Sequence, residues 1–326
     1  MNIMSDNQLM TRAAWLYYVG GLNQEATSKH MGLTRARVNK MLSQARDAGL
    51  VTIAINERDF GLLAEEEVIR AEFGLEFCIT TPKIGFSEVD TSAEARIAFS
   101  MVGAAAGQYL RDRLSANPEM IVGTGWGRTL AHLSRSLSGV SAPKAKFFSL
   151  MGSLTRNSSF SPFEVVHAIA QATGAEGYFL PAPFIADSES DRNVFLSQRV
   201  VLKTMELAKR ADLAFISVGD LTETSLLRDQ NMISEEEVAT LRDLGAVGDT
   251  NGIFFDQNGK AVDHDLNRRS VAIGLTLLAR TKTVALSAGR RKLIATQAIL
   301  RSGAIKGLII DGDSAVDLCQ SIQKRK

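Results

Sequence analysis

Cysteine, histidine, proline and long apolar runs are all scarce in this sequence of 326 residues. Cys78 and Cys319, its two cysteines, are too few for a disulfide framework or a zinc-ligand cluster. The four histidines lie far apart, without the spacing of a metal site or a catalytic triad. No apolar run approaches the roughly 18 residues of a membrane span, and the first residues lack a signal-peptide pattern. We therefore expect a soluble, cytoplasmic protein with no metal, no cofactor and no membrane partner.

Net charge of one sign is also nearly absent, because 37 basic residues face 36 acidic ones. Hydrophobic residues make up 45% of the chain, which is ordinary for a globular protein and argues against disorder. The charge is unevenly spread: residues 1–55 carry +3 and the remainder −2, and five basic residues with no acidic one lie from Lys29 to Arg46. Such asymmetry favours a small nucleic-acid-binding head on an acidic body.

Residues 8–55 have the pattern of a winged helix-turn-helix. Apolar residues at helical spacing predict a first helix over 8–19, and two further helices are expected over 24–31 and 35–48. The β-prone run 50–55 then resembles the strand of a wing. A small helical bundle without a DNA role is the alternative interpretation, and the basic third helix disfavours it.

The turn between the second and third helices carries the expected local signals. Asn23 and Thr34 are residue types that cap helix N-termini, and Gly32 permits the positive φ of a tight turn. Leu33 is predicted to be a buried plug behind this turn. The predicted apolar stripe of the third helix comprises Val38, Met41, Leu42 and Ala45.

The third helix is predicted to read DNA, because its N-terminal residues would face base edges while its cations contact phosphates. The supporting second helix places two polar residues near its own N-terminus, where phosphates bind. The predicted DNA-binding residues are Gln24, Thr27, Thr34, Arg35, Arg37, Asn39 and Lys40.

Strands and helices alternate in the rest of the chain, which predicts an α/β fold with an open, mostly parallel sheet. Strands are expected at 77–80, 120–122, 147–150, 213–218, 253–255, 283–286 and 308–310. Helices are expected at 93–114, 129–137, 163–173, 193–209, 234–244, 293–301 and 315–320, with capping boxes at Thr91 and Ser234. Residues 57–75 form an acidic helical connector, so the predicted domains are 1–56 and 57–326.

One strand-to-helix loop has the composition of an anion site. Gly123-Thr124-Gly125-Trp126-Gly127 follows a predicted strand, and Arg128-Thr129 opens a helix. Glycines let backbone N–H groups approach an anion, and a helix N-terminus adds positive potential. A dinucleotide site is disfavoured because Lys146, and not an acid, lies about 20 residues further on.

Other strand ends add further candidates. Gly152 and Ser153 follow a second strand, and Lys292 ends a cationic Arg-Arg-Lys run that precedes a helix, where it is a candidate phosphate or carboxylate contact. Asp220, Asp249 and Asp256 lie at strand ends, where carboxylates either bind sugar hydroxyls or cap turns. No nucleophile elbow or P-loop occurs in the sequence, so nothing in it demands catalysis.

These motifs together resemble the SorC family of sugar-responsive transcriptional regulators. The resemblance rests on LNQEATSKHMGLTRARVNKMLSQARDAGLVTIAI in the head, and on VGTGWGRTL, YFLPAPF, GDTNGIFFDQNG and SAGRRKLIATQAILRSGAIKGLIID in the body, in that order. It implies a winged helix-turn-helix followed by a Rossmann-like domain similar to sugar-phosphate isomerases. It further implies dimers or tetramers that bind operator DNA and respond to a sugar, polyol or phosphosugar.

The resemblance also implies which residues hold the effector. Gly123, Gly125, Trp126, Gly127, Arg128 and Thr129 would form its glycine-rich loop, Asp249 and Asp256 would line its pocket, and Lys292 would contact phosphate. A sugar-phosphate isomerase with an appended head is the alternative function, and a regulator whose body only oligomerises is a third.

Overall fold

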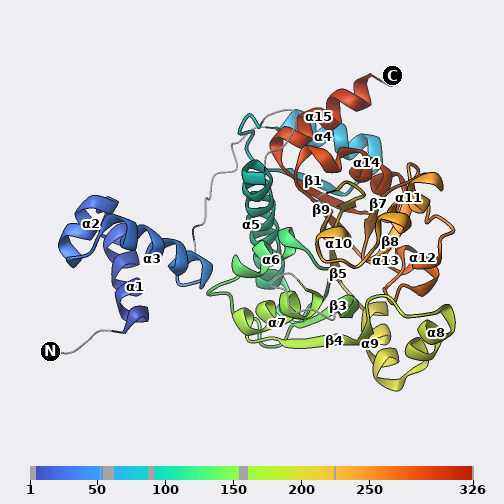
Figure 1. The fold of residues 1–326 in the computed structure, drawn as a ribbon, viewed down its shortest axis with the longest axis horizontal. Coiled ribbons are helices and arrows are strands. Elements are labelled where there is room, and N and C mark those ends of the chain that lie inside the picture. The colour runs from blue at the N-terminus through green and yellow to red at the C-terminus, as the bar shows by residue number, and fades with distance from the viewer. Residues whose placement is uncertain are drawn as a thin grey trace. The chain divides into compact units, whose positions relative to one another are not determined.

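The computed structural model describes residues 5–51, 53, 62–86, 92–153, 161–223 and 225–324. The chain divides into two units, Met1–Asn56 and Glu57–Lys326, which we call the head and the body (Figure 1). No helix within the described ranges is long and apolar enough to cross a membrane.

The head is helical and has the predicted helix-turn-helix. Its elements are α1 (Asp6–Ala14), the π-helix η1 (Trp15–Val19), α2 (Gln24–Met31) and α3 (Arg35–Asp47). The Asn23 side chain accepts a hydrogen bond from Ala26 N at 2.8 Å, and Thr34 caps α3 by accepting from Arg37 N at 3.2 Å. Gly32 has φ 64°, so the turn forms as predicted.

The core of the head is made by the predicted stripe of α3. Val38, Met41, Leu42 and Ala45 are all buried. Leu33 is half-buried, and so less enclosed than the plug we predicted, because it packs on the rim of this cluster. The predicted wing strand is not seen at Leu50, Val51 or Ile53, and residues 52, 54 and 55 lie outside the described part of the chain.

The body alternates strands and helices. Its strands are β1 (Phe77–Thr80), β2 (Ile121–Thr124), β3 (Lys146–Ser153), β4 (Glu176–Pro183), β5 (Leu213–Ser217), β6 (Gly219–Asp220), β7 (Ala246–Thr250), β8 (Ile253–Asp256), β9 (Thr283–Ser287) and β10 (Gly307–Ile310). Its first helices are α4 (Leu63–Phe73), α5 (Ser92–Ala116), α6 (Arg128–Arg135), α7 (Pro162–Thr173), α8 (Glu189–Ser197) and α9 (Arg199–Lys209). The remainder are α10 (Leu226–Asp229), α11 (Glu235–Asp243), α12 (Asp265–Arg269), α13 (Leu275–Leu278), the 3-10 turn η2 (Arg290–Lys292), α14 (Leu293–Arg301) and α15 (Gly312–Gln323).

Seven strands form one parallel sheet in the order β1-β10-β9-β5-β2-β3-β4. From β2 the chain builds outward through β3 to the edge strand β4, and then returns to β5 on the other side of β2. The strand order therefore reverses between β2 and β5. Ligands in open α/β sheets bind at such a point, outside the carboxyl ends of the strands.

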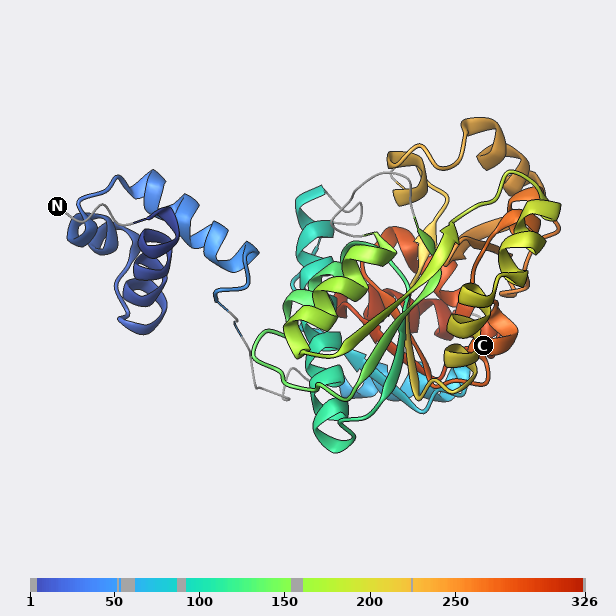
Figure 2. The same cartoon turned by 90° about the horizontal axis from the view of Figure 1, so that it is seen from below.

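Helices cover both faces of this sheet (Figures 1 and 2). On one face, α5, α6 and α7 pack over a cluster that includes Val122, Phe147 and Phe215. On the other, α4, α9, α14 and α15 contribute to a second cluster with Phe148 and Ile216. Neighbouring strand residues thus alternate between the two cores, as the period of a β-strand requires.

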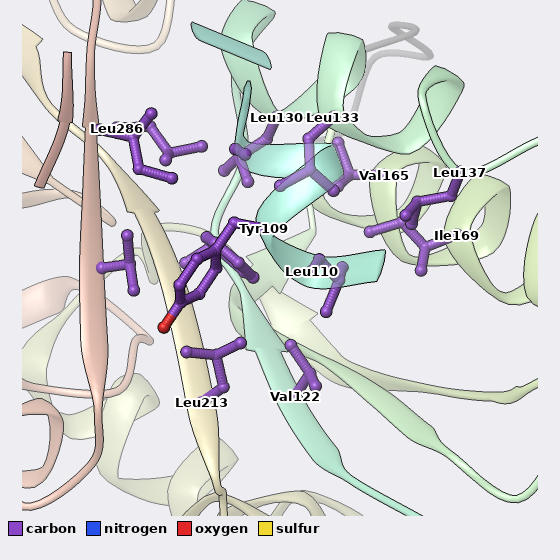
Figure 3. Packing of buried hydrophobic residues seen from close by; sticks show 14 of the residues in the cluster. Tyr109, Leu110, Val122, Leu130, Leu133, Leu137, Val165, Ile169, Leu213 and Leu286 are labelled. Carbon is purple, nitrogen blue, oxygen red and sulfur yellow. The ribbon is translucent and has the colours of Figure 1, made fainter. Parts of the chain in front are cut away.

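The first of these cores fixes the helix that follows β2. Figure 3 shows Leu130 and Leu133 of α6 near Leu110 of α5 and Val165 of α7, with Val122 and Leu213 of the sheet below them in the view. Leu130 and Leu133 are fully buried. The N-terminus of α6 is consequently held at the carboxyl end of β2.

The strands β6, β7 and β8 form a second, antiparallel sheet. This sheet was not predicted from the sequence. Strands β7 and β8 form a hairpin whose two-residue turn is Asn251-Gly252, with φ values of 51° and 73°. Positive φ at both positions is characteristic of a type I′ turn, for which Asn-Gly is the preferred sequence. The hairpin brings Asp249 and Asn251 to the same edge as the β2 and β5 loops.

The structure corrects several sequence predictions. The helix expected over 193–209 is two helices, because Gln198 is extended (ψ 135°) and lets α8 pack on α12 while α9 packs on β4. Strand β4 was missed because two prolines interrupt its pattern, although prolines are tolerated on an edge strand. The capping box at Ser234 is confirmed, whereas Thr91 and residues 57–61 of the connector lie outside the described residues.

Candidate DNA-binding face and ligand cavity

The exposed face of α3 carries the predicted reading residues. Arg35, Arg37, Asn39 and Lys40 are exposed, while the opposite face of the helix is buried in the head. Arg37 forms one ion pair, with Asp6 at 3.6 Å, between two largely exposed side chains. Such pairs contribute at most about 1 kcal/mol, so Arg37 is readily released to a phosphate.

The supporting helix α2 positions this face. Gln24 donates from Nε2 to Asn39 Oδ1 at 3.2 Å, which fixes the orientation of Asn39 and leaves its amide nitrogen to donate outward. Thr27, by contrast, is fully buried, and its hydroxyl donates to Asn23 O at 2.9 Å. The side chain of Thr27 is therefore a structural contact of the head and has no surface to offer a phosphate.

A cavity of about 620 Å³ opens at the carboxyl ends of the body strands. Its walls come from α5, the loop after β2 with α6, the end of β5 with β6, α10, the β7–β8 hairpin and the loop after β9. The predicted residues that line it are Trp126, Gly127, Arg128, Thr129, Asp220, Asp249 and Lys292. Four segments that lie far apart in the sequence are thus brought to one site.

The N-terminus of α6 points into this cavity wall. Gly127 precedes the helix with φ 119°, a conformation that side chains other than glycine rarely adopt, and no side chain caps the helix there. The first backbone N–H groups of α6 and its positive dipole end are thus presented at the cavity beside Arg128.

Two cations flank an aromatic ring at this end of the cavity. The Arg128 guanidinium carbon lies 5.7 Å from the centroid of Phe99, and Lys292 Nζ lies 5.2 Å from it. Burial lowers the pKa of Lys292, an effect that Asp220 opposes and the nearby Arg128 charge increases. An anion placed between the two cations relieves both the desolvation and the repulsion.

A buried acid lies near these cations. Asp249 is 5% exposed, and burial raises its pKa to about 7, although a hydrogen bond from Gly252 N at 3.2 Å opposes the shift. Beside it, Asn251 is 3% exposed and its Nδ2 has no hydrogen-bond partner among the described residues. The cavity therefore offers polar groups of both signs, which suits a ligand with hydroxyls and an anionic group.

Known proteins show the same organisation. Residues 58–319 match the family described as "Putative sugar-binding domain". The chain is 32% identical to the erythritol catabolism regulatory protein EryD of Brucella abortus over 311 residues, which covers 95% of this chain and 96% of EryD. The chain belongs to the SorC family of sugar-binding transcriptional regulators. This result confirms the resemblance drawn from the sequence motifs.

Two further members show how far the likeness extends. The transcriptional regulator LsrR of Escherichia coli O9:H4 is 28% identical over 325 residues, covering 98% of this chain and 96% of LsrR. The full-length sorbitol operon regulator SorC of Klebsiella pneumoniae superposes with a TM-score of 0.69 at 22% identity, over 97% of this chain and 100% of SorC. The SorC structure supports the fold of both units.

Six predicted effector residues of this SorC-family chain lie elsewhere. Gly123 and Thr124 are within β2, and Gly125 donates its N–H to Phe215 O at 2.8 Å behind the cavity. Gly152 and Ser153 end β3 and pair with Val271 and Phe184 through their backbones. Asp256 accepts hydrogen bonds from Asn258 N and Lys260 N and so stabilises its own turn. None of the six lines the cavity in the described chain.

Several lining residues were missed from the sequence. Arg96 on α5, His132 and Arg135 on α6, Asp229 on α10, Asn251 in the hairpin and Arg291 after β9 all line the cavity. Residues 128, 132 and 135 recur at helical spacing and so share one face of α6. This spacing is the signal from which His132 and Arg135 could have been predicted. Asp229 lies on a helix of only four residues, which has no periodicity to detect.

Proposed function

We propose that this protein is a DNA-binding regulator of a carbohydrate or polyol catabolic operon, controlled by a sugar, polyol or phosphosugar bound in the body. The observation that carries the proposal is the union, in one chain, of an exposed basic α3 face and a cavity lined by cations, acids and a free helix N-terminus. The names of EryD and SorC, which refer to erythritol catabolism and a sorbitol operon, support the ligand class.

The predicted residues divide between the two units under this proposal. In the head, Gln24, Thr34, Arg35, Arg37, Asn39 and Lys40 form the DNA interface, and Thr27 is omitted because it is buried. In the body, Trp126, Gly127, Arg128, Thr129, Asp249 and Lys292 contact the effector. Gly123 and Gly152 support these contacts from β2 and β3, and Gly125 does so directly after β2, through its hydrogen bond to Phe215 O.

The experiment is a thermal-shift screen of the full chain with sugars, polyols and their phosphates, followed by DNA-binding assays on its own upstream DNA. A ligand of the folded state raises the melting temperature by mass action. We expect one class of compound to raise it and also to change DNA affinity. A chain that shows no salt-sensitive preference for that DNA, with or without ligand, contradicts the proposal.

We also propose that the protein acts in the cytoplasm as a homo-oligomer, a dimer or a tetramer. A head with a net charge of +3 forms few phosphate contacts, so tight operator binding requires two or more linked heads. Sedimentation of the full chain tests this, and a monomer that binds its operator tightly contradicts it.

The second candidate is an isomerase acting on phosphosugars, favoured by one observation. Asp249, with a pKa near 7, has the property of a general base and lines the cavity. We favour the regulator because the relatives matched along nearly the whole chain are named regulators. Turnover of any compound in a phosphosugar panel decides for the enzyme.

A further inference from the structure

The short helix α10 places an acidic residue, Asp229, in the cavity wall beside Arg128. Helix α10 contributes Leu226, Leu227 and Asp229 to the cavity wall. Leu227 is buried, with 2% exposure, and anchors the helix to a small core that includes Ile233. Asp229, at the last position of α10, is instead 42% exposed in its side chain.

Asp229 is bound to Arg128. Its Oδ2 accepts a hydrogen bond from Arg128 Nη2, and the two form an ion pair across segments that are 101 residues apart in the sequence. Arg128 is also the first residue of α6, whose N-terminus has no side-chain cap among the described residues, and Arg128 and Lys292 both lie over the ring of Phe99. The carboxylate of Asp229 is thus a counterion of Arg128 in the wall of the cavity.

The ion pair between Asp229 and Arg128 is weak, and an anionic ligand can form more contacts with Arg128. Both partners are over a third exposed, and exposed ion pairs contribute only about 0–1 kcal/mol, because the released carboxylate is solvated again. A phosphate or carboxylate group in the cavity presents several oxygens to a planar guanidinium and to the N–H groups of α6 together. Asp229 accepts one hydrogen bond from the same cation, through Oδ2.

We propose that Asp229 is an exchangeable internal counterion, which an anionic group of the ligand displaces from Arg128. A phosphosugar then pairs with Arg128 and releases α10 from α6, whereas an uncharged polyol leaves the pair intact. Asp229 thereby sets how strongly the cavity favours anionic over neutral ligands. This inference rests on the proposed function only in taking the cavity as the ligand site.

The test measures binding of inorganic phosphate, ribose 5-phosphate and sorbitol to the full chain by calorimetry. Asp229→Asn keeps the size of the side chain but removes its charge. We expect it to tighten the binding of both phosphates about fivefold, the equivalent of roughly 1 kcal/mol of lost competition, without changing the affinity for sorbitol. Tightening for ribose 5-phosphate alone shows that the sugar is needed to place the anion.

A matched control lies on the neighbouring pair. Glu235 binds Arg228, the residue before Asp229, at 2.7 Å and does not appear among the cavity-lining residues. Glu235→Gln removes the same charge close by, and we expect phosphate affinity to stay within twofold of the unaltered chain. Asp229→Ser serves as a second variant, and equal melting temperatures without ligand establish that each variant is folded.

Several results overturn the inference. Phosphate affinity that is unchanged or weaker in Asp229→Asn shows that the carboxylate does not compete, and weaker binding in particular shows that it orients Arg128. Absence of phosphate binding in both proteins also overturns it. The proposed function fails separately, when no sugar, polyol or phosphate alters DNA affinity, and that result does not depend on the Asp229 variants.

Discussion

At the residue scale, the burial of Asp249 in the cavity wall makes the free energy of unfolding depend on pH. The unfolded chain loses the proton of this acid near pH 3.8, whereas burial raises the pKa to about 7 in the folded chain. Between these values the folded state binds more protons than the unfolded state. The free energy of unfolding therefore falls as pH rises from about 4 to about 7, and then levels off, because the carboxylate must be ionised while buried, a cost that the nearby Lys292 offsets only in part.

Removing this charge is expected to stabilise the ligand-free protein above neutral pH. Asp249→Asn keeps an oxygen to accept from Gly252 N, so at pH 8 we expect a melting temperature roughly 4–10 °C higher than that of the unaltered chain. The difference should vanish toward pH 4. The exposed Asp243→Asn is the control, with no change expected at either pH. A variant that melts lower than the unaltered chain at pH 8 contradicts the account.

Arg35 and Arg46 lie on the same helix, and comparing variants of the two distinguishes a base contact from a general effect of charge on DNA binding. Both are exposed, but Arg35 opens α3 at the reading end and Arg46 lies in its last turn. We expect Arg35→Ala to lower the affinity for operator DNA by about 1–3 kcal/mol and to relax sequence preference, as the loss of a base contact does. Arg46→Ala should weaken specific and random DNA equally. Anisotropy titrations with both DNAs measure this, and equal effects of the two variants contradict the assignment of α3.

At the element scale, the hairpin β7–β8 delivers Asp249 and Asn251 to the cavity through a tight turn. Gly252 in that turn has φ 73°, and a Cβ at this position would collide with the ring of Phe184. Gly245, with φ 79°, has nothing within 4 Å of its own Cβ position. The two glycines share the backbone conformation but differ in the space around it.

We expect Gly245→Ala to destabilise the body by about 1–2 kcal/mol, the cost of a side chain in a left-handed conformation. Gly252→Ala should cost a further 1–3 kcal/mol, because Phe184 must move from its packed position. Urea unfolding of each variant provides the comparison. Equal destabilisation of the two variants means that the ring does not hold the turn.

The elements differ in how well the sequence predicted them. The edge strand Phe77–Thr80 was predicted with its observed bounds, because a short apolar run between polar turns has few other interpretations. The glycine-rich loop before Arg128 was also recognised, since strand, glycines and helix follow in order. Strand β4 and helix α10 were not recognised, because prolines mask the first and four residues show no period.

The residues of the candidate site were predicted where local sequence patterns identify them, and were missed where their position depends on tertiary packing. Residues in the loops that follow parallel strands, such as Trp126 and Lys292, were found because such loops lie on one side of a sheet. Arg96 and Asp229 lie on the helices α5 and α10, whose positions depend on tertiary packing. The Asn251-Gly252 dipeptide is a strong hairpin signal, so the sequence does contain the information for the turn between β7 and β8.

At the scale of the whole molecule, a nearly neutral chain combines a head of net charge +3 with a body of −2. We propose that operator affinity resides in the head, Met1–Asn56, and ligand affinity in the body, Glu57–Lys326. A ligand regulates DNA binding only if it binds more tightly to one of two states of the protein. Because such coupling is reciprocal, operator DNA must change ligand affinity by the same factor.

The most direct measurement determines both halves of this linkage on the full chain. Anisotropy gives operator affinity with and without the compound selected by thermal shift, and calorimetry gives the affinity for that compound with and without saturating operator. We predict that operator affinity and ligand affinity change by the same factor, and we expect that factor to lie between about 5 and 150. Ligand binding that leaves operator affinity unchanged, with ligand affinity equally indifferent to DNA, contradicts the account of this protein as an effector-controlled regulator.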